Sequence, residues 1–218
     1  MGSITRSFAN NITTSGVLLP ASLNNNSIAN VTAYNASVAT GNMVLISSQT
    51  ASNSASISFT TGIDSTYKEY QFWFIDIHPR ADGYEFQFNL STDSGSNYNV
   101  TKTTTCFRSA FRENGTDPSL LYNTDSDLAQ STNPVFLSTN SIAGDADMSF
   151  VGSMSLFNPA STTYVKHFII NTATMNVNDY AVNHFIAGYG NTTSAINAIQ
   201  FSMTSGNFDG TILMYGIK

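Results

Sequence analysis

Residues 67–105 alternate apolar and polar side chains with a period of two, which is typical of β-strands with one buried face. The run 69–79 is rich in aromatic and β-branched residues and ends at a proline, and residues 80–83 supply a turn. The runs 84–91 and 99–107 follow, separated by a second turn rich in Ser, Asp, Gly and Asn. We expect these three runs to form a three-stranded antiparallel meander.

The phase of the alternation predicts which side chains are buried. In the run 84–91, Phe86, Phe88 and Leu90 share one face, and Gln87 and Asn89 share the other. The run 195–205 repeats this pattern, with one face formed by Ile199, Phe201 and Met203. We expect both apolar faces to line the core.

Similar strand signals recur along residues 41–218. They lie at 43–48, 55–61, 147–159, 162–175, 183–189, 195–205 and 210–218. Residues 108–136 are richer in turn formers and predict a long excursion with one short helix or strand near 119–122. Nine or ten half-buried strands need a second sheet to cover them, so the sequence predicts an all-β fold, a two-sheet antiparallel sandwich of the jelly-roll type.

The charge content limits the classes of partner. Charged residues are 10% of the chain, against about 25% in soluble globular proteins. The net charge is −6, and the eight Lys and Arg residues are scattered. Nucleic-acid binding requires a basic patch, as does electrostatic attachment to a membrane, so we expect neither partner. The N-terminus shows no signal-peptide pattern and no run of about 20 apolar residues occurs, so we expect assembly in the cytoplasm.

Residues 1–40 differ from the rest of the chain. They carry one charged residue, Arg6, and small apolar islands too sparse to form a core. We interpret this region as an extended N-terminal arm that buries its islands on another subunit or protein; the alternative is a flexible tail. The expected attachment residues are Ile4, Phe8, Val17, Leu18, Leu19, Leu23, Ile28 and Val31.

Candidate metal ligands have simpler interpretations. The three histidines, His78, His167 and His184, have no metal-site spacing, and we expect them at the surface or hydrogen-bonded in the core. The pairs 125/127 and 145/147 and the turn at Asp93 offer carboxylates to calcium, but Asx-turns explain them equally well. We expect no metal and no cofactor.

Candidate catalytic groups are equally sparse. Cys106 lies within a strand and is expected to be a buried apolar thiol. Asp76, Asp82 and Glu85 lie near one another along the chain, as glycosidase carboxylates could, but no nucleophile-elbow motif accompanies them. We therefore expect a protein that is not an enzyme.

Aromatic side chains beside loops are candidates for stacking on sugars. Most aromatic residues in strands pack in the core or across strands, so Trp73, Tyr84 and Tyr164 have a structural explanation. The better candidates adjoin loops, namely Tyr98, Tyr122, Tyr180 and Tyr189. A glycan therefore stays open as a ligand.

Three segments of the chain carry a resemblance to a known family. Residues 57–79, 161–169 and 187–218 resemble a β-rich module of the virion proteins of tailed phages, common in phages of marine bacteria and cyanobacteria. The opening residues 4–13 and 22–33 also resemble the N-terminal attachment segments of such proteins. The resemblance implies a non-enzymatic virion structural protein and supplies no catalytic residues.

Two placements on the virion follow from this resemblance. One is a capsid decoration or head-fibre protein that is anchored by its arm and exposes the jelly roll at the virion surface. The other is a tail fibre or tail-surface component, which could bind a host surface glycan. The expected partners are other capsid or tail proteins and further copies of the chain, most simply a homotrimer. A soluble glycan-binding module is the alternative from a different functional class.

Overall fold

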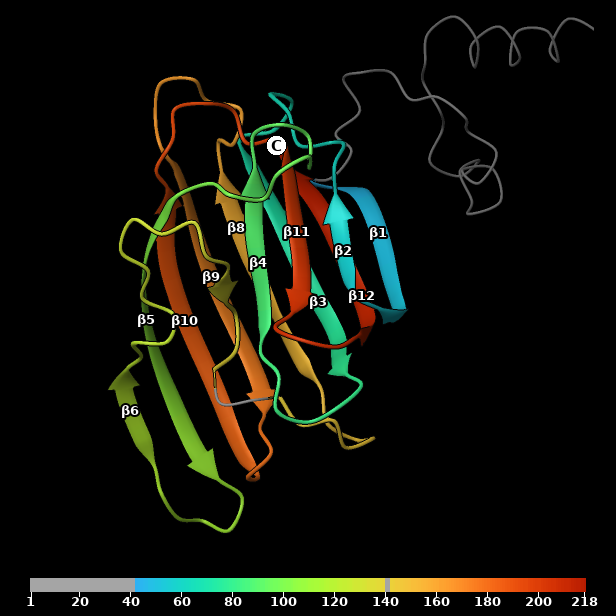
Figure 1. The fold of residues 1–218 in the computed structure, drawn as a ribbon, viewed down its shortest axis with the longest axis vertical. Coiled ribbons are helices and arrows are strands. Elements are labelled where there is room, and N and C mark those ends of the chain that lie inside the picture. Colours follow the sequence, from blue (N-terminus) through green and yellow to red (C-terminus); the bar gives the residue numbers. More distant parts are fainter. Residues whose placement is uncertain (1–41, 140–141) are drawn as a thin grey trace, which may run out of the picture. The chain divides into compact units, whose positions relative to one another are not determined.

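The computed structural model describes residues 42–139 and 142–218, and these form twelve β-strands (Figure 1). All the attachment residues expected between Ile4 and Val31 lie outside this part of the chain. The strands are β1 (Met43–Ser54), β2 (Ser56–Phe59), β3 (Glu69–Pro79), β4 (Phe86–Ser91), β5 (Lys102–Arg112), β6 (Ser119–Tyr122), β7 (Val135–Phe136), β8 (Phe150–Phe157), β9 (Lys166–Met175), β10 (Tyr180–Gly190), β11 (Ala198–Met203) and β12 (Phe208–Ile217).

The strands form two antiparallel sheets, which confirms the predicted sandwich. The large sheet has the order β1-β12-β3-β8-β9-β10-β5-β6, and the small sheet has the order β2-β11-β4-β7. The four strands β1-β12-β3-β8 and the small sheet together make an eight-stranded jelly roll, in which successive strands pass from one sheet to the other except for β4 and β7, which pair within the small sheet. The remaining strands, β9, β10, β5 and β6, widen the large sheet on one side (Figure 1).

The expected meander across residues 67–105 is wrong. Its three strands exist, but β3 and β5 lie in the large sheet and β4 lies in the small one. Strand β3 pairs with β12 and β8, whereas β4 pairs with β11 and β7. The Phe74 ring of β3 instead meets the Phe86 ring of β4 across the core, with centroids 5.6 Å apart. Alternation shows that a strand has one buried face, but it does not distinguish a paired neighbour from one that packs opposite.

A cluster of phenylalanine rings fills the space between the sheets. Phe201 of β11 lies at its centre, with ring centroids 5.2 Å from Phe74, 5.5 Å from Phe72 and 6.0 Å from Phe86. The faces predicted from the alternation of β4 and β11 are buried here. Edge-to-face rings contribute about 0.5–1.5 kcal/mol per pair beyond their buried area, so this cluster is a main source of stability.

The widened part of the large sheet has a different cover. Here the inner face lies beneath the segment 123–139, which follows the short strand β6 (Figure 1). The hydroxyl of Thr104 donates to the Ser126 carbonyl, and the hydroxyl of Thr172 donates to the Leu137 carbonyl at 2.8 Å. The predicted excursion therefore begins later than expected, because β5 continues to Arg112, and the element at 119–122 is a strand.

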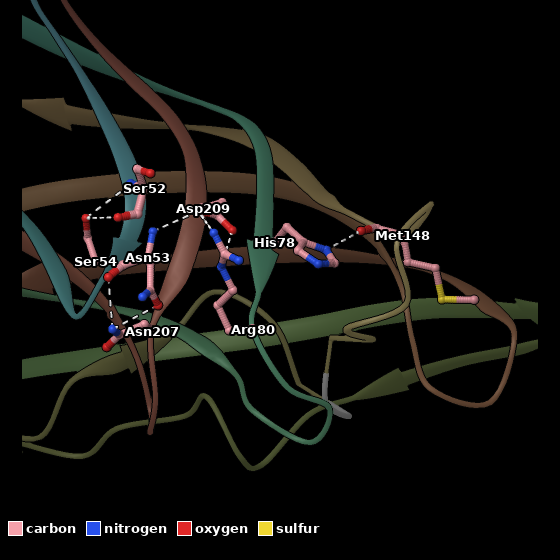
Figure 2. A network of polar contacts seen from close by, with 8 residues as sticks. All are labelled: Ser52, Asn53, Ser54, His78, Arg80, Met148, Asn207 and Asp209. Atoms are coloured by element: carbon pink, nitrogen blue, oxygen red, sulfur yellow. Dashed lines mark hydrogen bonds and ion pairs between the residues drawn. The ribbon is translucent and has the colours of Figure 1, made fainter.

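Polar groups fasten the strand ends beside the turn 80–83 (Figure 2). The Arg80 guanidinium donates two bonds to the Asp209 carboxylate, at 2.5 and 2.7 Å. The Asn53 backbone N–H also donates to Asp209, at 2.8 Å. The arginine and the amide lower the pKa of the Asp209 carboxyl although its partial burial opposes them. The cluster joins β1, β3 and β12 at one end of the large sheet.

Candidate functional site

The side of the large sheet that faces away from the small sheet carries most of the exposed large apolar side chains of residues 42–139 and 142–218. We call this side the outer face. The alternation of side chains along each strand and the cross-strand register show which residues point to this face. Its exposed apolar residues are Met43, Leu45, Trp73, Ile75, Phe107, Phe111, Leu120, Tyr122, Val151, Ile169 and Phe185.

One row of the outer face crosses six strands. The register aligns Trp73 with Ser153, then Asn171, Phe185, Phe107 and Tyr122. The rings of Phe185 and Phe107 stack with centroids 5.1 Å apart and planes 13° from parallel. The stacked pair stands above its neighbours along the strands, because Ala187, Thr105 and Ser109 are small. Phe185 and Phe107 therefore form a ridge across β10 and β5.

A groove lies on each side of this ridge. The first has a volume of about 540 Å³ and is lined by residues that include Ala173, Ala181 and Phe111. The second has a volume of about 460 Å³ and is lined by residues that include Thr105, Ile169 and Ala187. Each groove is larger than an aromatic side chain, and both have predominantly apolar walls.

The outer face also lacks charge in its centre. In strands β8, β9, β10 and β5, no Lys, Arg, Asp or Glu side chain points outward. The charged residues of these strands, such as Lys102, Lys166 and Arg108, alternate onto the inner side. An antiparallel sheet with one solvated face normally carries polar side chains there. This face departs from that pattern and has the character of a protein contact.

Apart from the two grooves, a polar pocket lies at the end of the widened part of the sheet. We call it the end pocket. It has a volume of about 680 Å³ and is lined by Arg108, Ala110, Asp117, Pro118, Ser119, Asn176, Val177, Asn178 and Tyr180. The Tyr180 hydroxyl donates to Asp117 Oδ2 at 3.1 Å, and the Arg112 guanidinium lies 5.5 Å from the centre of the Tyr180 ring. An aromatic ring combined with carboxylate, amide and guanidinium groups is suited to a ligand with many hydroxyls.

Two buried lysines, Lys102 and Lys166, donate to amide and carbonyl oxygens. Lys102 and Lys166 both lie opposite Gly190, on the two strands that flank β10. The Lys102 ammonium donates to Asn89 Oδ1 at 2.5 Å and to the Val100 carbonyl at 2.7 Å. The Lys166 ammonium donates to the Tyr164 and Thr192 carbonyls. Burial lowers the pKa of Lys102 to about 8 and also lowers that of Lys166. The bonds of both lysines hold neighbouring chain segments together, through three backbone carbonyls and the Asn89 side chain.

Cys106 and His184 are buried groups of the core. Cys106 is buried as expected, and burial raises the pKa of its thiol to about 11, so little thiolate forms at neutral pH. His184 Nε2 accepts from the backbone N–H of Thr139 at 3.2 Å. Burial, together with the positive charge of Arg108, lowers the pKa of His184 to about 4. The imidazole is therefore neutral under ordinary conditions.

The other candidate ligands are separated or used in turns. His78 Nδ1 lies 2.8 Å from the Met148 carbonyl, and the His167 ring packs beside Tyr189 on the outer face (Figure 2 for His78). Asp93 accepts from Ser91 Oγ and Asn97 N, and these bonds lower its pKa to about 2. Within residues 42–139 and 142–218 no three His, Cys, Asp or Glu side chains are grouped so that they could hold a metal ion.

The four loop tyrosines are divided among three places. Tyr180 lines the end pocket, Tyr122 and Tyr189 lie on the outer face, and the Tyr98 hydroxyl lies beside Gly95. Phe107, Phe111 and Phe185 are exposed on the outer face, which the sequence alone did not predict. A signal was present, since Phe107 is adjacent to the buried Cys106 and must point the opposite way.

The described residues include no helix that could cross a membrane. A comparison of the chain with protein-family models, with curated proteins and with solved structures gives no match. The fold and the two surfaces are therefore the basis for the proposals that follow.

Proposed function

We propose that this chain is a non-enzymatic structural protein of a tailed-phage virion, most simply a capsid decoration or head-fibre protein. The observation that carries the proposal is the outer face of the large sheet, which is rich in exposed apolar side chains and has no charged side chain pointing outward from β8, β9, β10 or β5. Two further points support it. Three segments of the chain resemble phage virion modules, and the jelly roll is a common architecture of viral capsid proteins and lectins.

The outer face supports an assembly role because leaving it in water is unfavourable. Burial of apolar surface stabilises a contact by about 25 cal/mol per Å². Side chains such as Trp73, Ile169 and Phe185 are 41%, 56% and 42% exposed, so a partner that covers them gains this energy. A protein with such a face is suited to permanent contacts within a particle.

The two parts of the chain have different roles in the virion. Residues 1–40 form the arm that docks it to capsid or tail proteins, and residues 41–218 form the sandwich at the virion surface. The protein is assembled in the host cytoplasm, and copies associate with one another, most simply as a homotrimer. No metal, cofactor, nucleic acid or membrane takes part.

Incorporation into particles tests the proposal. Three chains are compared with the wild type in purified virions: one lacking residues 1–40, one carrying Phe185→Glu, and a control carrying Tyr164→Glu. Tyr164 is 70% exposed and lies in the loop between β8 and β9, so its substitution leaves the outer face intact. Deletion and Phe185→Glu are expected to abolish incorporation, and Tyr164→Glu is expected to preserve it. Full incorporation of the deleted chain contradicts the arm.

A tail-fibre or tail-surface component that binds a host glycan is the second candidate, and the end pocket favours it. The Tyr180 hydroxyl donates its hydrogen bond to Oδ2 of Asp117. The other carboxylate oxygen, Oδ1, can then accept a hydrogen bond from a sugar hydroxyl. A glycan array with the wild type and with Asp117→Asn tests it, and Tyr164→Ala serves as the control. A consistent glycan signal that is lost in Asp117→Asn supports this candidate; a uniformly negative array contradicts it.

A further inference from the structure

The outer face is large enough for a stable contact between proteins. It spans eight strands, or about 34 Å at about 4.8 Å between neighbouring strands. Along β3 its outward side chains run from Glu69 to Ile75, which is about 20 Å at about 3.4 Å per residue. The product is roughly 700 Å², close to the roughly 800 Å² that each partner contributes to a standard interface.

The relief of the outer face is complementary to itself. The ridge that contains Phe185 and Phe107 runs between two apolar grooves, each bordered by alanine or threonine side chains. When two such faces meet about a two-fold axis, the ridge of each copy enters a groove of the other. Two sheets packed face to face lie about 10 Å apart, which is the distance that interlocking side chains fill.

The distribution of charge on the outer face also favours a second copy of the chain as its partner. A partner that is recognised through charge would find no opposite charge on the outward residues of β8, β9, β10 and β5. Two copies of a face with charge at its centre would repel each other, whereas the acidic side chains of this face, Glu113 beside one groove and Glu69 on β3, lie outside those four strands. A second copy of the chain therefore satisfies shape, area and charge at once.

We propose that the outer face binds the outer face of a second copy of this chain about a two-fold axis, with the Phe107–Phe185 ridge seated in a groove of the partner copy. The inference rests on the proposed function only in assigning this face to a protein contact. Because this contact joins copies in pairs, it doubles the number of chains in any assembly that the rest of the chain forms.

Sedimentation of the full chain tests the pairing. Two variants disrupt the face: Phe185→Glu places a charge on the ridge, and Thr105→Lys places one in a groove while leaving the ridge intact. Tyr164→Glu is the control, and the thermal transition of each variant checks that it is folded. Thr105 is exposed and buries no apolar group, so the second variant remains informative if Phe185→Glu fails to fold.

The expected result is that the mass of the assembly halves in both face variants and is unchanged in the control, with association weakened by on the order of tenfold or more. A mass that neither face variant changes overturns the inference, as does a wild type that sediments as a single chain. If the mass is unaffected but Phe185→Glu abolishes incorporation into virions, the face binds another virion protein; the inference fails and the proposed function stands. If the mass halves but the chain is missing from virions, the proposed function fails and the pairing stands.

Discussion

Phe107 and Phe185 are directly opposite each other on β5 and β10, and their rings stack at 5.1 Å although each is nearly half exposed, at 49% and 42%. Their neighbours Cys106 and Ile186 are also paired, and these point into the core. At this point of the register, both sides of the same two strands therefore carry apolar side chains. This relationship distinguishes the widened part of the sheet from an ordinary solvated sheet.

Truncating the centre of the phenylalanine cluster should destabilise the fold far more than truncating the outer face. Phe201→Ala removes a ring that meets five others and leaves a cavity, so a loss of about 3–5 kcal/mol in the free energy of unfolding is expected. Trp73→Ala should cost about 1 kcal/mol or less in the separated chain, because Trp73 is already partly exposed. Denaturant titration measures both. Equal losses would contradict the assignment of the core.

The stability of the fold should fall as the pH is lowered from about 6.5 to about 4. The pKa of His184 is about 4 in the folded protein and about 6.5 when the chain is unfolded. In this window the unfolded chain binds more protons, so acid favours it, by on the order of 3 kcal/mol in total. Asp93, whose pKa is lowered from 3.8 to about 2 on folding, contributes mainly below this window.

Denaturant titrations at several pH values measure this dependence, and His184→Gln is the matched variant. It keeps a polar side chain at the position but removes the titrating ring, so its stability should change much less between pH 6.5 and 4. An identical slope in the two proteins would show that another group is responsible.

The ion pair at the strand ends should contribute little. Arg80 and Asp209 are 53% and 29% exposed, and exposed pairs are worth about 0.2–1 kcal/mol. A double-mutant cycle with Arg80→Gln and Asp209→Asn should give a coupling energy in this range, which falls as salt is added. Asp209→Ala is expected to cost more than Asp209→Asn, since Asp209 Oδ1 also accepts from Asn53 N–H and only the asparagine keeps an oxygen that can accept. A coupling energy that is insensitive to salt would rule out this explanation.

The Cys106 thiol should be protected in the folded chain. It is fully buried with a pKa raised to about 11, so a thiol reagent should react with it only as fast as the sandwich opens. An introduced thiol at Asn171, on the outer face, should react at once in the separated chain. Reaction of the two thiols at similar rates under native conditions would contradict the placement of β5.

Much of the fold was predictable from local patterns. Strand β3 begins and ends where its aromatic run does, and Phe86, Phe88 and Leu90 are buried as their phase indicates. These features depend on side-chain direction within one strand, which the sequence records directly. The two-sheet sandwich also followed, because half-buried strands need a cover.

The pairing of strands was not predictable in the same way. Whether β4 lies beside β3 or opposite it depends on contacts with β11 and β12, more than a hundred residues away. The outer face was missed for a related reason. Phe107 on β5, Phe185 on β10 and Trp73 on β3 lie far apart in the sequence, and only the register of the sheet aligns them. The end pocket likewise joins the turn after β9 to the hairpin of β5 and β6.

The burial of the outer face in the assembled protein is the most direct test of the account. Hydroxyl-radical footprinting compares the modification of Trp73, Phe107 and Phe185 in purified virions with that of Tyr164 in the same sample. The account predicts that the three face residues are protected in the particle, while the loop residue Tyr164, at 70% exposure, is modified freely. Modification of Trp73 and Phe185 in the particle at the rates of the separated, folded Thr105→Lys chain would contradict it.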